Sequence, residues 1–267
     1  MTDWDDAFDN VGHVPNALGY FETWKDQAKA FRDCGIKQDL SLAYGPADRQ
    51  KLDIFWPDTK PKGLVIFIHG GYWIRLDRSY FSHLAAGPLA NGWAVAVPSY
   101  TLAPEARISG MTREIAQAIT FAANKVDGPI RIAGHSAGGH LATRMICKDS
   151  PIDTVTQNRI VKTVSISGLH DLRNLLKINL NEILQLTPSE ATIESPCLNT
   201  PVENAKATCW VGSIERPEFI RQNHLLRDHW AKYGTDIDVY IDDMKHHFDV
   251  IDSLEQPDSQ LVRSLLS

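Results

Sequence analysis

Residues 130–138 read Ile-Arg-Ile-Ala-Gly-His-Ser-Ala-Gly, a short apolar run that leads directly into the pattern G-x-S-x-G. The run has the composition of a buried strand, and the residues after it are rich in Ala and Leu, as in a helix. A serine between a strand and a helix is typical of a nucleophile elbow, whose tight turn exposes the hydroxyl at a sheet edge. The pattern alone is weak because few positions are fixed. A glycine-rich nucleotide-binding turn is the alternative, but no G-x-G-x-x-G motif follows the first strand.

Further apolar runs along the chain predict the rest of the sheet. Runs without polar alternation suit strands buried on both faces, as in a parallel sheet. They lie at 64–68, 93–97, 130–133, 161–166, 207–211 and 237–241, and an alternating stretch at 51–56 predicts an antiparallel strand near an edge. Helices are expected at 21–32, 78–91, 111–126, 137–149, 217–233 and 248–265. The alternation predicts an α/β fold with a mostly parallel central sheet and helices on both faces.

The segment 168–200 interrupts this alternation. It carries apolar residues at roughly helical spacing between 172 and 184, followed by several prolines. We expect one domain over 1–267, with 168–200 as a short cap-like excursion over the carboxyl edge of the strands, in position to cover a site. A packed surface insertion without a functional role is the alternative.

The composition excludes several classes of protein. The 267 residues carry a net charge of -6, with no Lys/Arg cluster for nucleic acid and no apolar run near the roughly 18 residues of a membrane span. The stretch Met1–Asp6 is acidic, whereas a secretory signal is basic and then apolar. The four cysteines form no C-x-x-C pair, so we expect reduced thiols, a cytoplasmic enzyme and no zinc site. A homodimer is compatible with the sequence, which does not determine the oligomeric state.

A second motif, His-Gly-Gly-Tyr-Trp at 69–73, directly follows the run at 64–68. An α/β-hydrolase places at this point the loop whose N–H groups help to form the oxyanion hole. Glycine suits the loop because backbone, not side chain, must face the substrate carbonyl. An ordinary tight turn is the alternative reading of these five residues.

A third motif supplies candidates for the general base. Asp-Asp-Met-Lys-His-His-Phe at 242–248 follows the run at 237–241, and the base of this fold comes from such a loop, last in chain order. His246 and His247 compete for the role. A metal site built on the pair is the alternative, but it lacks a third ligand at suitable spacing.

The acid of the triad is expected after a strand between the serine and the base. Glu215 is the first carboxylate after the run at 207–211, and the order Ser…Asp/Glu…His permits glutamate. Asp171, one strand earlier, and Glu218, in the following helix, are its rivals. The sequence therefore favours Glu215 without excluding the other two.

Together these motifs resemble the arylformamidases (kynurenine formamidases), near the hormone-sensitive-lipase-like branch of the α/β-hydrolase fold. The resemblance covers nearly the whole chain. It rests on HVPNA at 13–17, HGGYW at 69–73, GHSAGGH at 134–140, SGLHDL at 167–172 and HFDVI at 247–251. It implies His247 rather than His246 as the base, and an oxyanion hole made by the N–H groups of Gly71, Tyr72 and Ala137. The family usually has Asp at the position of Glu215.

The resemblance implies hydrolysis of N-formylkynurenine to kynurenine and formate, in tryptophan catabolism. Ser136 would attack the carbonyl, His247 would carry the proton and Glu215 would orient His247, with no metal or organic cofactor. Trp73 is the expected substrate contact, and a small acyl or formyl compound is the expected partner. A general carboxylesterase or amidase for short acyl groups is the alternative. A non-catalytic binding protein that retains the fold is a more remote one.

Overall fold

The computed structural model describes residues 2–267, and Met1 lies outside the described part. Over these residues an eight-stranded sheet has the order β1-β2-β4-β3-β5-β6-β7-β8. β2 runs antiparallel to β1 and β4, and every pair from β4 to β8 is parallel. This arrangement confirms the α/β-hydrolase fold with its mostly parallel sheet. The strands are β1 (Gln38–Ala43), β2 (Lys51–Phe55), β3 (Leu64–Ile68), β4 (Ala94–Pro98), β5 (Ile130–His135), β6 (Ile160–Ile166), β7 (Lys206–Gly212) and β8 (Asp236–Asp242).

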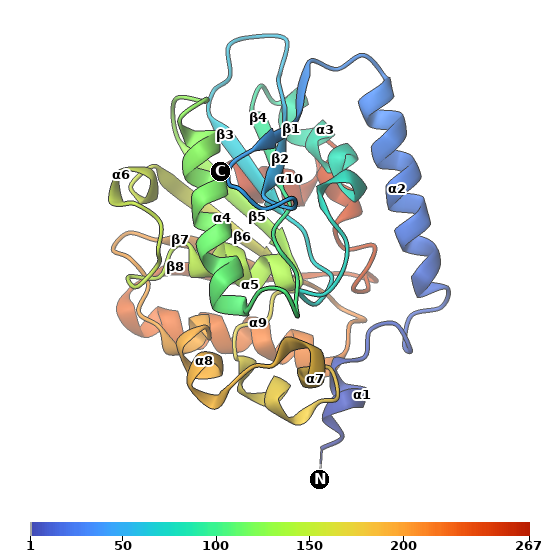
Figure 1. Cartoon of the computed structure of the whole chain (residues 1–267), viewed down its shortest axis with the longest axis vertical. Coiled ribbons are helices and arrows are strands. Elements are labelled where there is room, and N and C mark those ends of the chain that lie inside the picture. Colours follow the sequence, from blue (N-terminus) through green and yellow to red (C-terminus); the bar gives the residue numbers. More distant parts are fainter. Residues whose placement is uncertain (1) are drawn as a thin grey trace.

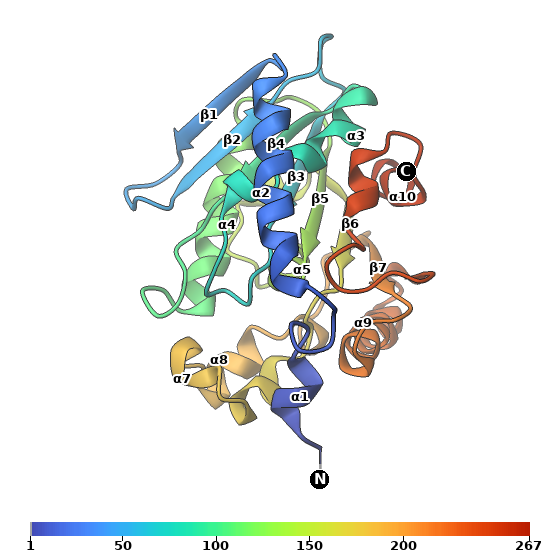
Figure 2. The same cartoon turned by 90° about the vertical axis from the view of Figure 1, so that its right-hand side faces the viewer.

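Helices cover both faces of the sheet because both faces are apolar. In β3, Ile66 and Ile68 pack with the helices α4 and α5, while Val65 and Phe67 pack with α2, η2 and α10 on the opposite face. Figures 1 and 2 show these two layers. The α-helices are α1 (Trp4–Phe8), α2 (Ala17–Asp33), α3 (Ala86–Ala90), α4 (Ile108–Ala123), α5 (Ala137–Arg144), α6 (Thr154–Gln157), α7 (Asn181–Leu184), α8 (Pro188–Ile193), α9 (Pro217–Trp230) and α10 (Gln260–Leu266). The 3₁₀ helices are η1 (Arg78–Tyr80), η2 (Ser82–Ala85), η3 (Leu172–Lys177), η4 (Pro196–Leu198), η5 (Ala231–Tyr233) and η6 (Asp252–Glu255).

Several elements differ from the expectation: α1 and α6 were not predicted, and three further differences concern β1 and two of the expected helices. β1 was not predicted because it is an edge strand whose side chains are mostly exposed, so no apolar pattern marks it. The single helix expected at 248–265 is divided into η6 and α10, with Pro257 between them, since proline lacks the N–H that a helix interior needs. The helix expected at 78–91 is likewise divided, into η1, η2 and α3.

Two segments far apart in the sequence meet beyond the carboxyl ends of the strands. The segment 168–200 contains η3, α7, α8 and η4, and α1 lies beside it in both views (Figures 1 and 2). The Asp5 carboxylate accepts hydrogen bonds from the backbone N and the Nδ2 of Asn179, at 2.8 and 3.0 Å. The N-terminal chain is thereby fixed at the end of the sheet where the candidate site lies.

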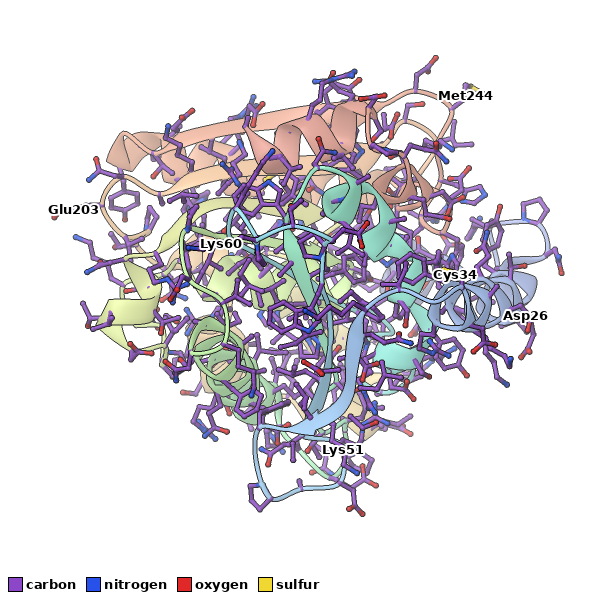
Figure 3. The ribbon with its side chains drawn as sticks, turned by 90° about the horizontal axis from the view of Figure 1, so that it is seen from above. Asp26, Cys34, Lys51, Lys60, Glu203 and Met244 are labelled. Atoms are coloured by element: carbon purple, nitrogen blue, oxygen red, sulfur yellow. The ribbon has the colours of Figure 1, made fainter. Side chains whose placement is uncertain are left out.

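All four cysteines within the described part are unpaired. Cys34, labelled in Figure 3, follows α2 and is exposed, and Cys147, Cys197 and Cys209 are buried. None of the helices over residues 2–267 is both long enough and apolar enough to cross a membrane.

Candidate active site

Ser136 lies in the turn that joins β5 to α5. Its φ of 56° and ψ of -118° place it in a region that residues other than glycine rarely adopt. The turn is tight: a Cβ at Gly134 would lie 2.1 Å from the Gly138 carbonyl oxygen, and a Cβ at Gly138 would lie 2.0 Å from that of Ile68. Both glycines of the motif are therefore required by close backbone approach, and the strained serine projects from the end of the sheet.

The glycine loop after β3 packs directly on this turn. A Cβ at Gly70 would lie 2.8 Å from the His135 carbonyl oxygen and 3.0 Å from the Ser136 Cβ. Within residues 2–267, the amides of Gly71 and Tyr72 have no hydrogen-bond acceptor. Ala137 begins α5, where first-turn amides lack an intrahelical partner. Free amides and a helix N-terminus beside one hydroxyl can stabilise negative charge on a bound carbonyl oxygen.

The Glu215 carboxylate meets the His247 imidazole in the interior. Glu215 Oε2 lies 2.7 Å from His247 Nδ1, and the Glu215 side chain is fully buried. The other oxygen, Oε1, accepts hydrogen bonds from Ser167 Oγ at 2.5 Å and from the Gly212 amide at 2.8 Å. These two donors fix the orientation of the carboxylate, with Oε2 directed at the imidazole. Glu215 can therefore hold His247 with Nδ1 protonated and Nε2 available as a base.

The backbone of His247 is fixed by His135, the residue before the serine. His135 Nε2–H donates to the His247 carbonyl oxygen at 2.8 Å, and the two rings lie 4.8 Å apart. Burial, and then the proximity of His247, lower the pKa of His135 well below its usual value, so His135 stays neutral. Ser136 and His247 line one pocket, but no hydrogen bond joins Ser136 Oγ to the ring within residues 2–267. Such bonds are often long in unliganded sites and shorten when substrate binds.

The neighbouring His246 makes different contacts. Its Nε2 lies 3.1 Å from the Tyr20 hydroxyl, and its Nδ1 accepts the backbone N–H groups of Phe248 and Asp249. His246 therefore joins α2 to the loop after β8 and does not meet Glu215. Across residues 2–267, no group of three or more His, Cys, Asp or Glu side chains is arranged to hold a metal ion.

The two rival carboxylates are engaged elsewhere. Asp171 pairs with Arg173 at 2.8 Å and caps η3. Burial raises the pKa of Asp171, but the hydrogen bonds and charge of Arg173 outweigh it and leave the pKa below its usual value. Glu218 pairs with Arg221 at 2.7 Å. Of the three acids considered from the sequence, only Glu215 contacts His247.

The pocket above Ser136 has a volume of about 250 Å³ and is walled by the N-terminal segment. Residues 8–24 supply the largest share of its lining, and 168–200 supplies none. The lining residues are Phe8, Asp9, Asn10, Val11, Phe21, Trp24, Gly71, Tyr72, Arg75, Leu76, His135, Ser136, His247 and Phe248. The sequence analysis did not predict this wall, although the quoted stretch at 13–17 lies within it.

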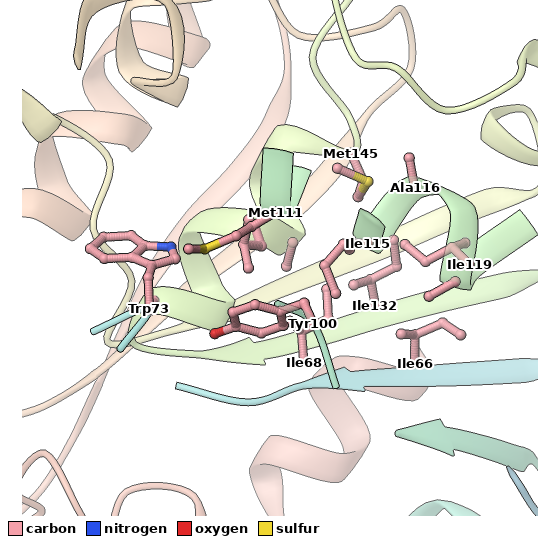
Figure 4. Packing of buried hydrophobic residues seen from close by; sticks show 14 of the residues in the cluster. Ile66, Ile68, Trp73, Tyr100, Met111, Ile115, Ala116, Ile119, Ile132 and Met145 are labelled. Atoms are coloured by element: carbon pink, nitrogen blue, oxygen red, sulfur yellow. The ribbon is translucent and has the colours of Figure 1, made fainter. Parts of the chain in front are cut away.

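Trp73, the expected substrate contact, does not line this pocket. Its indole is fully buried, edge-on to His140 at 5.3 Å, and lies beside Met111 in the apolar cluster of Figure 4. Trp73 is therefore a residue of the hydrophobic core. Ser167, by contrast, holds Glu215 and was not singled out. The only signal for it was its position at the end of a strand, in the stretch at 167–172.

Comparisons with known proteins agree over nearly the whole chain. The family model described as BD-FAE matches residues 52–223, a range that contains Ser136 and Glu215 but ends before His247. Kynurenine formamidases of Salmo salar and Danio rerio are 28% and 27% identical, over 87% and 85% of this chain and 82% and 80% of theirs. A crystal structure from Silicibacter sp. TM1040, provisionally described as a thioesterase, is 44% identical with a TM-score of 0.95 and covers 100% of both chains. The resemblance expected from the motifs is confirmed.

Proposed function

The chain belongs to the BD-FAE family and is a serine hydrolase, and from this premise we propose that it removes a formyl group from an aromatic amine. The reaction would convert N-formylkynurenine to kynurenine and formate. One observation carries the proposal: Ser136 and His247, which pairs with the buried Glu215, line one pocket with aromatic walls. The similarity to kynurenine formamidases supports the same substrate.

The residues can perform the reaction in two steps. Ser136 Oγ attacks the formyl carbon while His247 Nε2 takes its proton, and Glu215 stabilises the resulting imidazolium. The amides of Gly71, Tyr72 and Ala137 would bind the oxyanion. His247 then protonates the leaving nitrogen, which departs as the amine and leaves a formyl ester on Ser136. Water, deprotonated by His247, attacks this ester and releases formate and the free serine.

The space around Ser136 is smaller on the side of Gly70 than on the side of the pocket. This difference agrees with a small acyl group and a large leaving group. Gly70 packs against the serine, so little room remains on that side. The pocket side is walled by Phe21, Trp24 and Phe248, whose ring centroids lie 5.8–6.1 Å apart. The rings are tilted or edge-on to one another and form an apolar wall against which another ring can pack. An aryl amine therefore suits the wall better than an aliphatic alcohol.

A second candidate is hydrolysis of a thioester or of another short acyl ester. The structure that is 44% identical to this chain is the observation that favours a thioester. The same triad would serve, because ester, thioester and amide cleavage share the acyl-enzyme. The fold and the triad do not discriminate among them, since selectivity lies in the pocket.

The test is a comparison of kcat/KM for three substrates. We expect N-formyl-L-kynurenine to exceed p-nitrophenyl acetate and an acetyl thioester by at least about tenfold, a difference of about 1.4 kcal/mol in transition-state binding. A thioester or ester that is turned over while the formamide stays intact would replace the formamidase proposal. Ser136→Ala, measured with each substrate, serves as the control for contaminating hydrolases.

The proposal includes a cytoplasmic location. The four unpaired cysteines are in keeping with a reducing compartment. Fractionation of the source cells, followed by detection of the native chain, would test this, and recovery outside the cytoplasmic fraction would contradict it.

A further inference from the structure

Two opposite charges line the pocket and lack ionic partners. Arg75 and Asp9 both contribute to its lining, and within residues 2–267 neither forms an ion pair with another side chain. We propose that Arg75 binds a carboxylate and Asp9 an ammonium, so that the pocket selects a leaving amine that carries an α-amino acid group. This inference rests on the proposed function, and it assigns to these two residues a role that the reaction chemistry does not require.

Arg75 is anchored on the glycine loop itself. Its amide donates to the Gly71 carbonyl oxygen at 3.2 Å, and its Cγ lies 3.0 Å from the place where a Cβ at Gly71 would stand. The stem of the side chain therefore passes over the glycine whose own amide is free. Arg75 is among the residues that line the same pocket. Its planar set of donors matches the two oxygens of a carboxylate.

Asp9 is held in place by the backbone that follows it. Its Oδ1 accepts the Gly12 amide at 2.9 Å, and its Oδ2 lies 2.3 Å from the position of a Cβ at Gly12. A side chain at position 12 would therefore displace this carboxylate. Asp9 thus presents a fixed negative charge at the wall, which suits an ammonium group.

The electrostatics of Tyr72 place both charges near the oxyanion loop. Burial raises the pKa of Tyr72 well above its usual value, and the negative charge of Asp9 raises it further. Arg75 acts in the opposite direction on the same hydroxyl. Both charges therefore act on one group that lines the pocket, although no contact joins Arg75 to Asp9 within 4.0 Å.

A neutral polar group lies next to Asp9. The Asn10 side chain is only 3% exposed, lines the same pocket, and its Nδ2 has no hydrogen-bond partner. Buried amides are almost always paired, so an orphan at a pocket wall points to a ligand acceptor that completes it. The carbonyl oxygen of an aryl ketone, between the ring and the amino acid group, is an acceptor of the required kind.

The first experiment compares two ligands that differ only in the charged group. Isothermal titration calorimetry would measure L-kynurenine and the neutral 2′-aminoacetophenone on the otherwise intact Ser136→Ala protein, where no turnover interferes. We expect L-kynurenine to bind about tenfold more tightly, as charge-assisted hydrogen bonds predict. Adding Arg75→Gln or Asp9→Asn should reduce this ratio to about one. The neutral ligand should keep its affinity in every variant.

Three further variants sharpen the test. Gly12→Ala keeps the Asp9 charge but displaces it, so it should reproduce Asp9→Asn. Arg113→Gln and Asp26→Asn remove exposed charges outside the pocket and should leave the ratio unchanged. Equal affinity for the two ligands in the Ser136→Ala protein would overturn the inference, as would variants that weaken both ligands alike.

The two proposals fail separately. Selective, Arg75-dependent binding of L-kynurenine without turnover of N-formyl-L-kynurenine by the native enzyme would remove the formamidase proposal and keep the amino acid subsite. Turnover of both N-formyl-L-kynurenine and 2′-formamidoacetophenone with equal kcat/KM would remove the amino acid subsite and keep the formamidase proposal.

Discussion

The floor and the wall of the pocket are built in different ways. The floor comprises Ser136, His247 and the loop at 69–73, which lie at the carboxyl ends of β5, β8 and β3 and are positioned by backbone contacts. The wall is residues 8–24, which lie outside the sheet and present side chains. Backbone geometry fixes atoms that must react, whereas side chains on a separate segment can be exchanged without disturbing them. Under the proposed function, the groups that react and the side chains that select the leaving group therefore belong to separate parts of this chain.

The wall is nevertheless tied to the floor at three points, each beside a proposed site residue. The Tyr72 hydroxyl, next to Gly71, donates to the Phe8 carbonyl oxygen. Arg216, next to Glu215, binds the carboxylate and carbonyl of Asp6. His246, next to His247, meets the Tyr20 hydroxyl. A shift of the N-terminal segment would therefore act on the loop at 69–73 and on the neighbours of Glu215 and His247.

Removing the Ser136 hydroxyl should have the largest effect. Ser136→Ala is expected to lower kcat by about 10⁶-fold for every substrate, because no other group can form the acyl-enzyme. Single-turnover kinetics would measure it, with circular dichroism to show that the variant is folded. Undiminished turnover would show that Ser136 is not the nucleophile and that the acyl-enzyme mechanism proposed for it is wrong.

Neutralising the acid should have the next largest effect. Glu215→Gln is expected to lower kcat by about 10⁴-fold, because it loses the charge that stabilises the His247 imidazolium. Asp171→Asn is the control, since Asp171 pairs with Arg173 instead of His247, and it should keep kcat within a few-fold. A lower kcat for Asp171→Asn than for Glu215→Gln in steady-state assays would show that Asp171 is the acid of the triad.

Gly70→Ala tests whether backbone fit alone maintains the floor. The new Cβ would lie 2.8 Å from the His135 carbonyl oxygen, so the loop must shift and misalign its amides. We expect kcat to fall about 10²-fold for all substrates, in line with the loss of one oxyanion donor. Gly110→Ala, whose Cβ would meet nothing closer than 3.8 Å, should be active and no less stable. A Gly70→Ala enzyme of normal kcat would show that the loop accommodates a Cβ at this position without displacing its amides.

Phe21→Ala tests the wall without touching the floor. We expect KM for the aryl formamide to rise about tenfold with kcat nearly unchanged, because an aromatic contact is lost in binding. A small aliphatic ester, which does not reach the wall, should be unaffected. Leu18→Ala, an exposed position of the same helix, is the control. A fall in kcat for both substrates would show that wall and floor are not independent.

Tyr20→Phe should have the smallest effect. It removes the hydroxyl that meets His246 Nε2, a partly buried hydrogen bond worth about 1 kcal/mol. Thermal unfolding should occur about 2 °C lower, with KM raised only slightly. Tyr233→Phe, at an exposed position, should not change the unfolding temperature. A Tyr20→Phe protein with an unaltered unfolding temperature would show that this hydrogen bond contributes nothing to stability.

The sequence indicated the floor better than the wall because the two carry different signals. Ser136 and the loop at 69–73 have strict local requirements, in which glycine is the only residue that fits between neighbouring backbones. The wall has no such requirement. The spacing of Phe21 and Trp24 is that of any amphipathic helix. The neighbouring residues in the chain do not show what these two side chains contact. Trp73 was misassigned as a substrate contact for the same reason, since a motif gives a position along the chain and no direction in space.

The amino-acid sequence was enough to predict seven of the eight strands within residues 2–267, the turn at Ser136 and the glycine loop, because strand burial and tight turns depend on neighbours in the chain. The contact of Glu215 with His247, the separate pairing of Asp171 with Arg173 and the bond from Ser167 to Glu215 appear only in the tertiary structure. It also brought residues 8–24 over a serine more than a hundred positions away. These outcomes depend on contacts between distant segments, which are fixed by how the helices and the N-terminal chain pack around the sheet.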